Sequence, residues 1–348
     1  MTNKKKQHDY FAVDLHGDIL SDVSKRRHIN EETGVLKRLH YANLQKGQVK
    51  IQVLPIFIEY AYQPEGSLRQ SILYVASLIH ELDESSDIFM RIKNAEDLDK
   101  VMASDKIGLM LSFEGVEPIA RDFELMAVFQ DLGLHMVGLT WNWANSVAEG
   151  CVEDSNSGLT FIGRNMVKEM SRLGMMLDVS HLSVKSFWDA IEIQTGPVLA
   201  SHSNAQGVYK SARNLDDDQI KALAERGGII GLNFIPKFVG PSGTDYNKLA
   251  EHAAYIANLV GIQHVAVGAD YVDYLIRAGR YGGKLQNVPT TQRIAGTPDQ
   301  EDTSKFPSVA ELSELYLALL RHGFAQEEAK GVMGEHALKF LKENLPKK

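Results

Sequence analysis

Short apolar runs rich in β-forming residues alternate with longer segments of helical periodicity along nearly the whole chain. This alternation is typical of parallel α/β proteins, in which each helix returns the chain to the next parallel strand. Eight βα units in a chain of 348 residues favour a (β/α)8 TIM barrel over a doubly wound open sheet. The expected strands are 10–16, 50–58, 107–113, 135–141, 175–181, 197–203, 229–235 and 264–270.

The segments between these strands carry the residues expected at helix boundaries. Ser183 and Asp216 stand where N-caps belong, and Gly174, Gly227 and Gly261 follow the last turns of helical periodicity. These boundaries support the division of the chain into short strands and longer helices.

The remaining segments fit the same single domain, residues 1–348. A short run at 87–92 is a candidate ninth, peripheral strand. Residues 277–306 are polar, rich in Gly and Thr and without periodicity, which predicts a long loop. We do not expect a domain linker there, because a helical segment at 308–323 follows almost at once and leads to a helical C-terminal end.

The composition narrows the class of partner. Lys and Arg number 37 against 45 Asp and Glu, so the net charge is -8 and the surface repels nucleic acid and anionic membranes. No apolar run of signal-peptide or membrane-spanning length is present, and the single cysteine, Cys151, excludes an internal disulfide. We therefore expect a soluble, cytoplasmic protein with no nucleic-acid or membrane partner.

Histidine and acidic residues gather where the predicted strands end. The carboxyl ends of the strands of a parallel barrel meet at one face, and function resides at that face. His16 and Asp18 are two residues apart, and side chains two apart in a strand point to the same face, so both can reach one ion. The residues at these ends are His16, Asp18, Glu114, His181, His202 and Asp270.

This set favours a site for two divalent metal ions. Three imidazoles and two carboxylates exceed what one tetrahedral zinc site requires, and Glu114 could bridge two ions with its two oxygens. A single histidine at a strand end is more often a hydrogen-bonded core residue, but here three of the 12 histidines stand at such ends. His135 and His264 instead open their strands, which places them on the opposite, stabilising face.

Arg213 follows the sixth predicted strand, in a loop before a helix. Its guanidinium could form two parallel hydrogen bonds with a substrate carboxylate. By spacing alone, a salt bridge with Asp216 or Asp217 explains this position about as well.

Small residues that would let a metal cluster approach the backbone stand beside the candidate ligands: Gly17, Gly115, Gly268 and Ala269.

Six motifs occur in the order DLHGD, SFEG, LDVSH, SHSNA, ARN and GADY. In this order they resemble the membrane dipeptidase (renal dipeptidase) family of zinc metallopeptidases. The similarity runs from about Val13 to the closing segment EEAKGVMGEHALKFL, and so covers nearly the whole chain. The resemblance implies a TIM barrel of the metal-dependent hydrolase type, a homodimer, and hydrolysis of free dipeptides, including those with a C-terminal D-residue.

The resemblance also implies a role for each candidate ligand. His16 and Asp18 would hold one zinc ion, His181 and His202 would hold the other, and Glu114 would bridge both. Two zinc ions would lower the pKa of a shared water, so that a metal-bridged hydroxide forms near neutral pH, and they would polarise the scissile carbonyl.

For the substrate, the resemblance implies that Arg213 receives the free carboxylate and that Asp270 passes a proton from the attacking water to the leaving amine. The chain departs from the family pattern at the end of the fourth strand. In the family a histidine follows LT at this place, whereas here the sequence is GLTWNWAN, with Trp141 in the position of that histidine. An indole N–H donates one hydrogen bond but cannot take a positive charge. Either Trp141 or Asn142 substitutes in binding the substrate, or substrate preference and rate differ.

Two alternatives stay open on the sequence. Trp141 is compatible with another binuclear-metal amidohydrolase, such as a cyclic amidase, a lactonase or a phosphoesterase, because one barrel supports many reactions. A metal-bearing scaffold without activity is disfavoured. An inactive site would not explain why Arg213 and Asp270 occur at the strand ends together with five candidate metal ligands. The absence of a signal peptide and of an apolar C-terminal tail resembles the soluble bacterial branch of the family.

Overall fold

The structure is a computed structural model that describes residues 8–242, 244–272 and 307–347. Eight parallel strands form the barrel expected from the sequence, in the spatial order β7, β6, β5, β4, β2, β1, β9, β8. A ninth strand, β3, pairs in parallel with the first residues of β4 and is the peripheral strand expected at 87–92. The strands are β1 (Ala12–Asp14), β2 (Val49–Phe57), β3 (Phe89–Arg91), β4 (Ile107–Glu114), β5 (Leu134–Gly138), β6 (Met176–Asp178), β7 (Val198–Leu199), β8 (Ile230–Leu232) and β9 (Val265–Val267).

The barrel closes between β7 and β8. Ala200, just after β7, forms a parallel bridge with Ile230 of β8. The Ala200 N–H donates to Ile229 O at 2.9 Å, and the Gly231 N–H donates to Ala200 O at 2.8 Å. The prediction of a (β/α)8 barrel is therefore confirmed, with a seam of few hydrogen bonds between the short strands β7 and β8.

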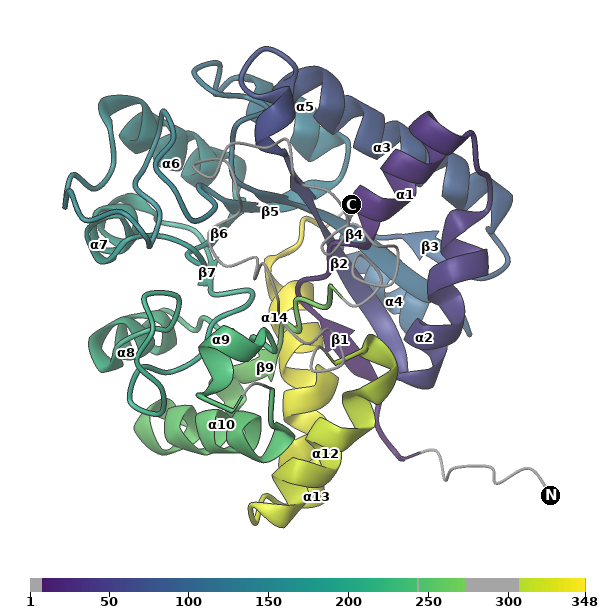
Figure 1. Ribbon diagram of the computed structural model, residues 1–348, viewed down its shortest axis with the longest axis vertical. Coiled ribbons are helices and arrows are strands. Elements are labelled where there is room, and N and C mark those ends of the chain that lie inside the picture. Colours follow the sequence, from purple (N-terminus) through teal and green to yellow (C-terminus); the bar gives the residue numbers. More distant parts are fainter. Residues whose placement is uncertain (1–7, 243, 273–306, 348) are drawn as a thin grey trace.

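Helices surround the ring of strands (Figure 1). Ser183 and Asp216 are N-caps whose side chains accept hydrogen bonds from the first turns of α7 and α8, and Gly174 ends α6 in the left-handed conformation, with φ 67°. The helices are α1 (Ile19–Asn30), α2 (Tyr41–Lys46), α3 (Ser67–Glu84), α4 (Ala95–Met102), α5 (Leu125–Asp131), α6 (Phe161–Leu173), α7 (Val184–Ile193), α8 (Asp217–Glu225), α9 (Pro236–Val239), α10 (Tyr246–Val260), α12 (Leu312–Arg321), α13 (Gln326–Lys330) and α14 (His336–Asn344).

The C-terminal helix α14 lies across the middle of the ring in Figure 1 and closes one end of the barrel. Its buried residues Phe340 and Leu341 belong to the same apolar cluster as the side chains that fill the barrel interior. That interior layer consists of Val13, Leu15, Ile51, Val53, Met110, Met136, Met176, Leu199 and Ala266. Because α14 also packs against α4 and β9, the opposite end, where the strands terminate, is left for a functional site.

β1 is shorter than the expected strand 10–16, which changes how its polar residues are placed. The regular ladder ends at Asp14, although the Leu15 N–H still donates to Val267 O and the Gly17 N–H to Val53 O. Asp18 is the N-cap residue of α1 and does not lie in the strand. His16 and Asp18 therefore do not share a face through the alternation of one strand, as the sequence argument assumed.

The predicted loop at 277–306 lies outside the described residues. Helix α12, which follows it, packs against α10, and a single apolar cluster extends from Tyr10 to Met333. These contacts support the proposal of one domain.

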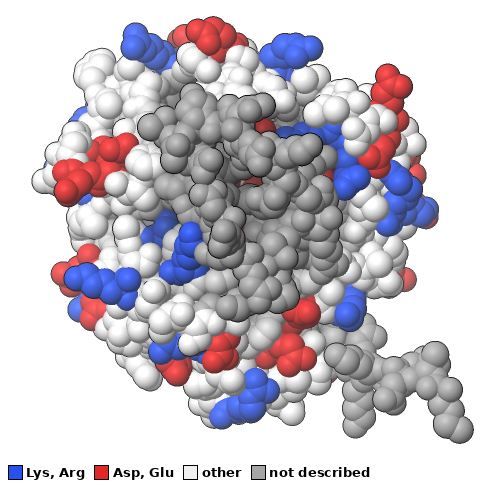
Figure 2. All heavy atoms as spheres, viewed as in Figure 1, with Lys and Arg blue, Asp and Glu red and all other residues white. Residues whose placement is uncertain are grey.

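Within the described ranges, no helix is both long and apolar enough to cross a membrane. Figure 2 shows basic and acidic side chains interspersed over the described surface of one face.

Candidate metal centre

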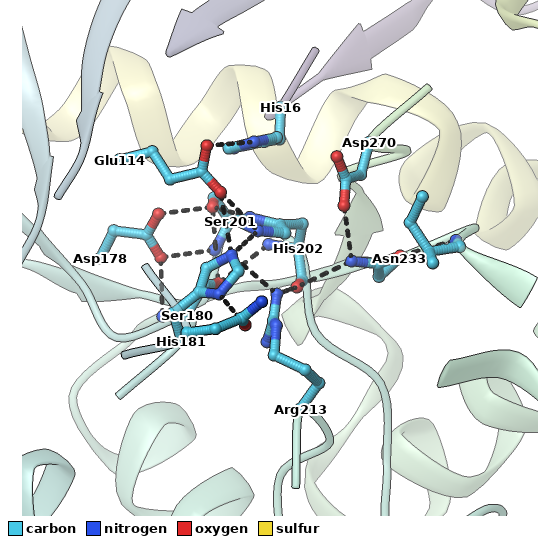
Figure 3. Close-up of polar contacts among 12 residues, drawn as sticks. His16, Glu114, Asp178, Ser180, His181, Ser201, His202, Arg213, Asn233 and Asp270 are labelled. Carbon is cyan, nitrogen blue, oxygen red and sulfur yellow. Dashed lines mark hydrogen bonds and ion pairs between the residues drawn. The ribbon is translucent and has the colours of Figure 1, made fainter. Parts of the chain in front are cut away.

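Glu114, the last residue of β4, lies between histidines that follow three other strands, β1, β6 and β7 (Figure 3). Its Oε2 is 3.7 Å from His16 Nε2. Its Oε1 is 2.9 Å from His181 Nε2 and 3.8 Å from His202 Nε2. Each carboxylate oxygen thus faces a different set of imidazoles, which is the arrangement that a bridging ligand requires.

Asp18 and Asp270 complete the side of the cluster that faces His16. The ligand atoms of His16, Asp18 and Asp270 all lie within 4.8 Å of one another, and the same holds for His16, Glu114 and His202. The structure therefore brings together the residues expected at the strand ends, although they are far apart in the sequence.

Two members of this cluster have backbones in the left-handed region. His181 has φ 70° and Asp270 has φ 55°. This conformation is uncommon for residues other than glycine and clusters at functional sites. Neighbouring hydrogen bonds hold both residues in place, because His181 O accepts from the Cys151 N–H at 2.7 Å and the Asp270 N–H donates to His16 O at 3.0 Å.

Several atoms with lone pairs and no proton between them face one another in the cluster. His181 Nδ1 lies 2.9 Å from Asn142 Oδ1, an atom that only accepts, so His181 carries its proton on Nδ1. Its Nε2 lone pair then faces His202 Nε2 at 2.8 Å and Glu114 Oε1 at 2.9 Å. His16 Nε2 is buried without a hydrogen bond from the described residues. These atoms fit a cation placed among them.

The charges of the cluster fit the same conclusion. Burial and the nearby Arg213 lower the pKa of His181 to about 3, and burial and His16 lower that of His202. Burial also disfavours a charge on His16, but Glu114 outweighs it and raises the pKa of His16 to about 10. The pKa of Glu114 stays well below its usual range despite burial, because His16 and His181 are adjacent. A divalent ion would take the place of the proton beside this carboxylate.

Arg213 points into the cluster and is only 5% exposed. Its Nη2 donates to His202 O at 3.0 Å and lies 3.3 Å from His181 Nε2. The alternative salt bridges are not formed, because Asp216 caps α8 and Asp217 accepts a hydrogen bond from a tyrosine hydroxyl. A guanidinium at the edge of the cluster is available to an anionic group bound there.

Trp141 and Asn142 occupy different positions relative to His181. The Trp141 ring centroid is 6.2 Å from that of His181, and it packs against Phe57 at 5.3 Å and Tyr60 at 6.2 Å. Asn142 is buried and uses Oδ1 to accept from the far nitrogen of His181. Trp141 therefore lies beside a candidate ligand, whereas Asn142 lies behind it.

Several buried polar residues that were not expected from the sequence hold the candidate ligands in place. Asp14 accepts from the backbone N–H groups of His16 at 3.3 Å and Ala269 at 2.8 Å, and from Gln52 at 3.0 Å. It thereby ties the end of β1 to β2 and β9. A usable signal was present, since Asp14 interrupts an apolar strand. The other residues of this kind are Asp178, Ser201 and Asn233.

Comparisons with known proteins agree with this geometry. The family model described as membrane dipeptidase (Peptidase family M19) matches residues 3–279. The chain belongs to the membrane dipeptidase family. The resemblance seen in the motifs is thereby confirmed, and the family's metallopeptidase character implies a divalent metal ion in members of the family.

Members of the family with curated names are distant relatives. Dipeptidase tcpJ of Claviceps purpurea is 26% identical over 282 residues, which cover 80% of this chain and 60% of the relative. An uncharacterized dipeptidase of Schizosaccharomyces pombe is 30% identical over 241 residues, which cover 68% of this chain and 53% of the relative. The chain thus matches only between 53% and 60% of the length of these two relatives.

Solved structures share the fold over almost the whole chain. A metallopeptidase from Rhodobacter sphaeroides, liganded with a phosphinate mimic of the dipeptide L-Ala-D-Ala, has a TM-score of 0.80 at 21% identity and covers 97% of this chain and 100% of its own. An amidohydrolase from Pseudomonas aeruginosa has a TM-score of 0.77 at 21% identity, with 97% of each chain covered. Both likenesses support the TIM-barrel fold.

Proposed function

We propose that this chain is a metal-dependent dipeptidase that hydrolyses the peptide bond of free dipeptides. The observation that carries this proposal is the position of Arg213, whose Nη2 is 3.3 Å from the Nε2 of the candidate ligand His181. In a dipeptide, one Cα separates the free carboxylate from the scissile amide. A carboxylate bound to Arg213 by two hydrogen bonds would therefore hold that amide beside the metal ligands.

The ligand set supports two ions, and imidazole with carboxylate is the chemistry that zinc accepts. In the proposed assignment, His16 and Asp18 hold one ion, His181 and His202 hold the other, and Glu114 contacts both. When bound, two divalent ions supply a water of lowered pKa and polarise the scissile carbonyl.

Asp270 is the proposed proton carrier. In the metal-free chain, burial raises the pKa of Asp270 to about 6, with Glu114 adding to the shift and His16 opposing it. Asn233 donates to Oδ2 at 3.2 Å, which orients the carboxylate and leaves Oδ1 for the water and the leaving amine. Asp270 would take the proton from the attacking water and return it to the amine.

We extend the proposed substrates to dipeptides with a C-terminal D-residue, because the Rhodobacter sphaeroides structure contains a mimic of L-Ala-D-Ala. The fold likeness to that protein makes the same class a reasonable first choice for this chain. A homodimer and a cytoplasmic location stay predictions.

A second candidate function is another binuclear-metal amidohydrolase. Trp141 favours it, because the indole packed against Phe57 and Tyr60 stands where a charged or hydrogen-bonding imidazole was expected. Turnover of cyclic amides, lactones or phosphoesters by protein that leaves free dipeptides intact would select this alternative.

The test of the dipeptidase proposal is Arg213→Met. Losing a charge-assisted pair should raise KM for free dipeptides by on the order of 10- to 100-fold, and KM for an N-acyl amide without a carboxylate should stay unchanged. The exposed Arg172, which pairs with Glu169 on α6, provides the matched control Arg172→Met. Equal effects on both substrates, at equal metal content, would contradict the proposed role of Arg213.

A further inference from the structure

A chain of short hydrogen bonds runs from His202 away from the cluster (Figure 3). His202 Nδ1 lies 2.6 Å from Ser201 Oγ, and Ser201 Oγ lies 2.5 Å from Asp178 Oδ2. Asp178 is the last residue of β6, and Ser201 follows β7. All three are buried: His202 is 1% exposed, Ser201 0% and Asp178 5%. Bulk water therefore does not compete for these protons.

The donor of each bond follows from proton counting. Asp178 accepts with Oδ1 from the N–H groups of Ser180 at 3.0 Å and Ser201 at 2.9 Å, and a carboxylate only accepts. The single hydroxyl proton of Ser201 is therefore given to Asp178 Oδ2. Ser201 Oγ must then accept from His202, so the one N–H of the neutral His202 ring lies on Nδ1.

This direction has a consequence at the other ring nitrogen. His202 Nε2 carries the lone pair, and it faces His181 Nε2 at 2.8 Å and Glu114 Oε1 at 3.8 Å. That tautomer is the one in which His202 can ligate an ion on the side of Glu114. The opposite tautomer would put a proton where the ion should be.

We propose that Asp178 and Ser201 are positioning residues that fix His202 in its metal-ligating tautomer. The proposal rests on the proposed function only in taking His202 as a metal ligand. It extends outward from the ligands, because neither positioning residue contacts the ion or the substrate. Partners of this kind orient a ligating histidine and make it a stronger ligand.

The single substitution Asp178→Asn reverses the chain of donors. The new Oδ1 can still accept from the two backbone N–H groups, while Nδ2 now donates to Ser201 Oγ. The Ser201 hydroxyl, which no longer donates to Asp178, has two remaining acceptors, His202 Nδ1 at 2.6 Å and Ser180 Oγ at 3.5 Å. The much shorter contact favours donation to His202 Nδ1. His202 is then expected to carry its proton on Nε2, the atom that faces Glu114.

The experiment is a measurement of ¹⁵N chemical shifts of the histidine rings in the full-length, chelated protein, followed by zinc titration against a competing chelator. In the wild-type chain, His202 is expected to be protonated on Nδ1. In Asp178→Asn it is expected to be protonated on Nε2, and zinc affinity at one of the two sites should fall by about 10- to 100-fold. An unchanged tautomer in a folded Asp178→Asn protein would overturn the proposal.

Two further variants separate positioning from packing. Ser201→Ala removes the acceptor of Nδ1, so the His202 signal should show both tautomers and zinc affinity should fall; wild-type values of both would overturn the proposal. Asp189→Asn is the matched control, because Asp189 also accepts a backbone N–H, from Leu159, but lies on α7. It should leave the tautomer and the zinc affinity unchanged.

The outcomes distinguish this inference from the proposed function. The tautomer is measured without metal or substrate, so a chain that binds zinc and cleaves no dipeptide can still satisfy the inference. A chain that cleaves dipeptides with the wild-type tautomer in Asp178→Asn satisfies the proposed function and overturns the inference.

Discussion

The buried side chain of Asn142 contacts a candidate metal ligand. Its Oδ1 accepts a hydrogen bond from His181 Nδ1 at 2.9 Å. From the sequence we expected this amide to bind substrate, because it follows Trp141 at a strand end. At the residue scale, we therefore expect Asn142 to act through the metal ligand.

Substitution of Asn142 with leucine tests this expectation. Asn142→Leu keeps the volume but leaves the buried Nδ1–H of His181 without an acceptor, so zinc affinity should fall by about 10- to 100-fold. KM for a dipeptide, measured at saturating zinc, should change little. Cys151→Ala is the control, because the thiol contacts the same oxygen only at 3.6 Å. A raised KM with normal zinc affinity would restore the substrate-binding role.

Residue type and position at the end of a predicted strand were enough to single out the candidate ligands in the sequence. His181, His202 and Glu114 are chemically distinctive and stand where predicted strands end. Asp178 and Ser201 were not singled out, because their importance lies in hydrogen bonds between two strands. Such bonds depend on the register of neighbouring strands, which a single sequence does not contain.

At the scale of elements, the ends of β7, β8 and β9 approach one another unusually closely. A Cβ added to Gly268 would lie 1.7 Å from Ser201 O and 3.1 Å from His202 Cα. A Cβ on Gly231 would lie 2.0 Å from Ser201 O. Glycine at these two positions therefore lets the backbone that carries His202 reach the centre.

Gly268→Ala should disrupt both the seam and the centre. Because a backbone carbonyl cannot move aside as a flexible side chain does, we expect a loss of about 1–3 kcal/mol of unfolding free energy and weaker zinc binding. Urea unfolding and zinc titration measure the two effects. Gly240→Ala is the control, since its nearest atom is Lys248 Cγ at 3.4 Å. Wild-type stability of Gly268→Ala would contradict the close approach.

Helix α14 affects stability from the opposite end of the barrel. Leu341 is fully buried against the interior layer, so Leu341→Ala should lower the unfolding free energy by about 2–5 kcal/mol. Zinc affinity and KM should stay unchanged at temperatures where the variant is folded. The partly buried Leu338 offers the comparison, and Leu338→Ala should cost less. Loss of zinc binding in folded Leu341→Ala would show that the two ends are coupled.

At the scale of the whole molecule, the alternation of strands and helices indicated eight βα units and favoured a barrel over an open sheet. The seam between β7 and β8 and the closure of one end by α14 were not predictable, because both depend on contacts between distant segments. The sequence pattern identified 308–323 as helical but did not indicate which end of the barrel the C-terminal helix would cover.

The stability of the whole fold should depend on pH through buried neutral histidines. Burial lowers the pKa of His252, whose Nε2 donates to Val239 O while Nδ1 accepts from the Ala205 N–H. Below about pH 6.5 the unfolded chain binds a proton that folded His252 refuses, so the unfolding free energy falls as pH falls, by up to about 1.4 kcal/mol per pH unit for each such group.

His252→Gln checks this pH dependence. Glutamine can donate and accept hydrogen bonds but does not titrate. The slope of the unfolding free energy against pH, measured between pH 6.5 and 5, should therefore be smaller by up to the contribution of one proton, about 1.4 kcal/mol per pH unit. Urea unfolding of chelated protein measures the slope without a contribution from metal release. His135 and His336, whose pKa values burial also lowers, remain in both proteins as an internal reference. Identical slopes would contradict the neutral state of His252.

The most direct test of the central claim is hydrolysis of L-Ala-D-Ala, L-Ala-L-Ala and an N-acetylated control by zinc-reconstituted and by chelated protein. The account predicts cleavage of the free dipeptides that requires zinc and disappears on chelation, with the blocked control left intact. Protein that binds two equivalents of zinc and cleaves none of the free dipeptides would contradict the account.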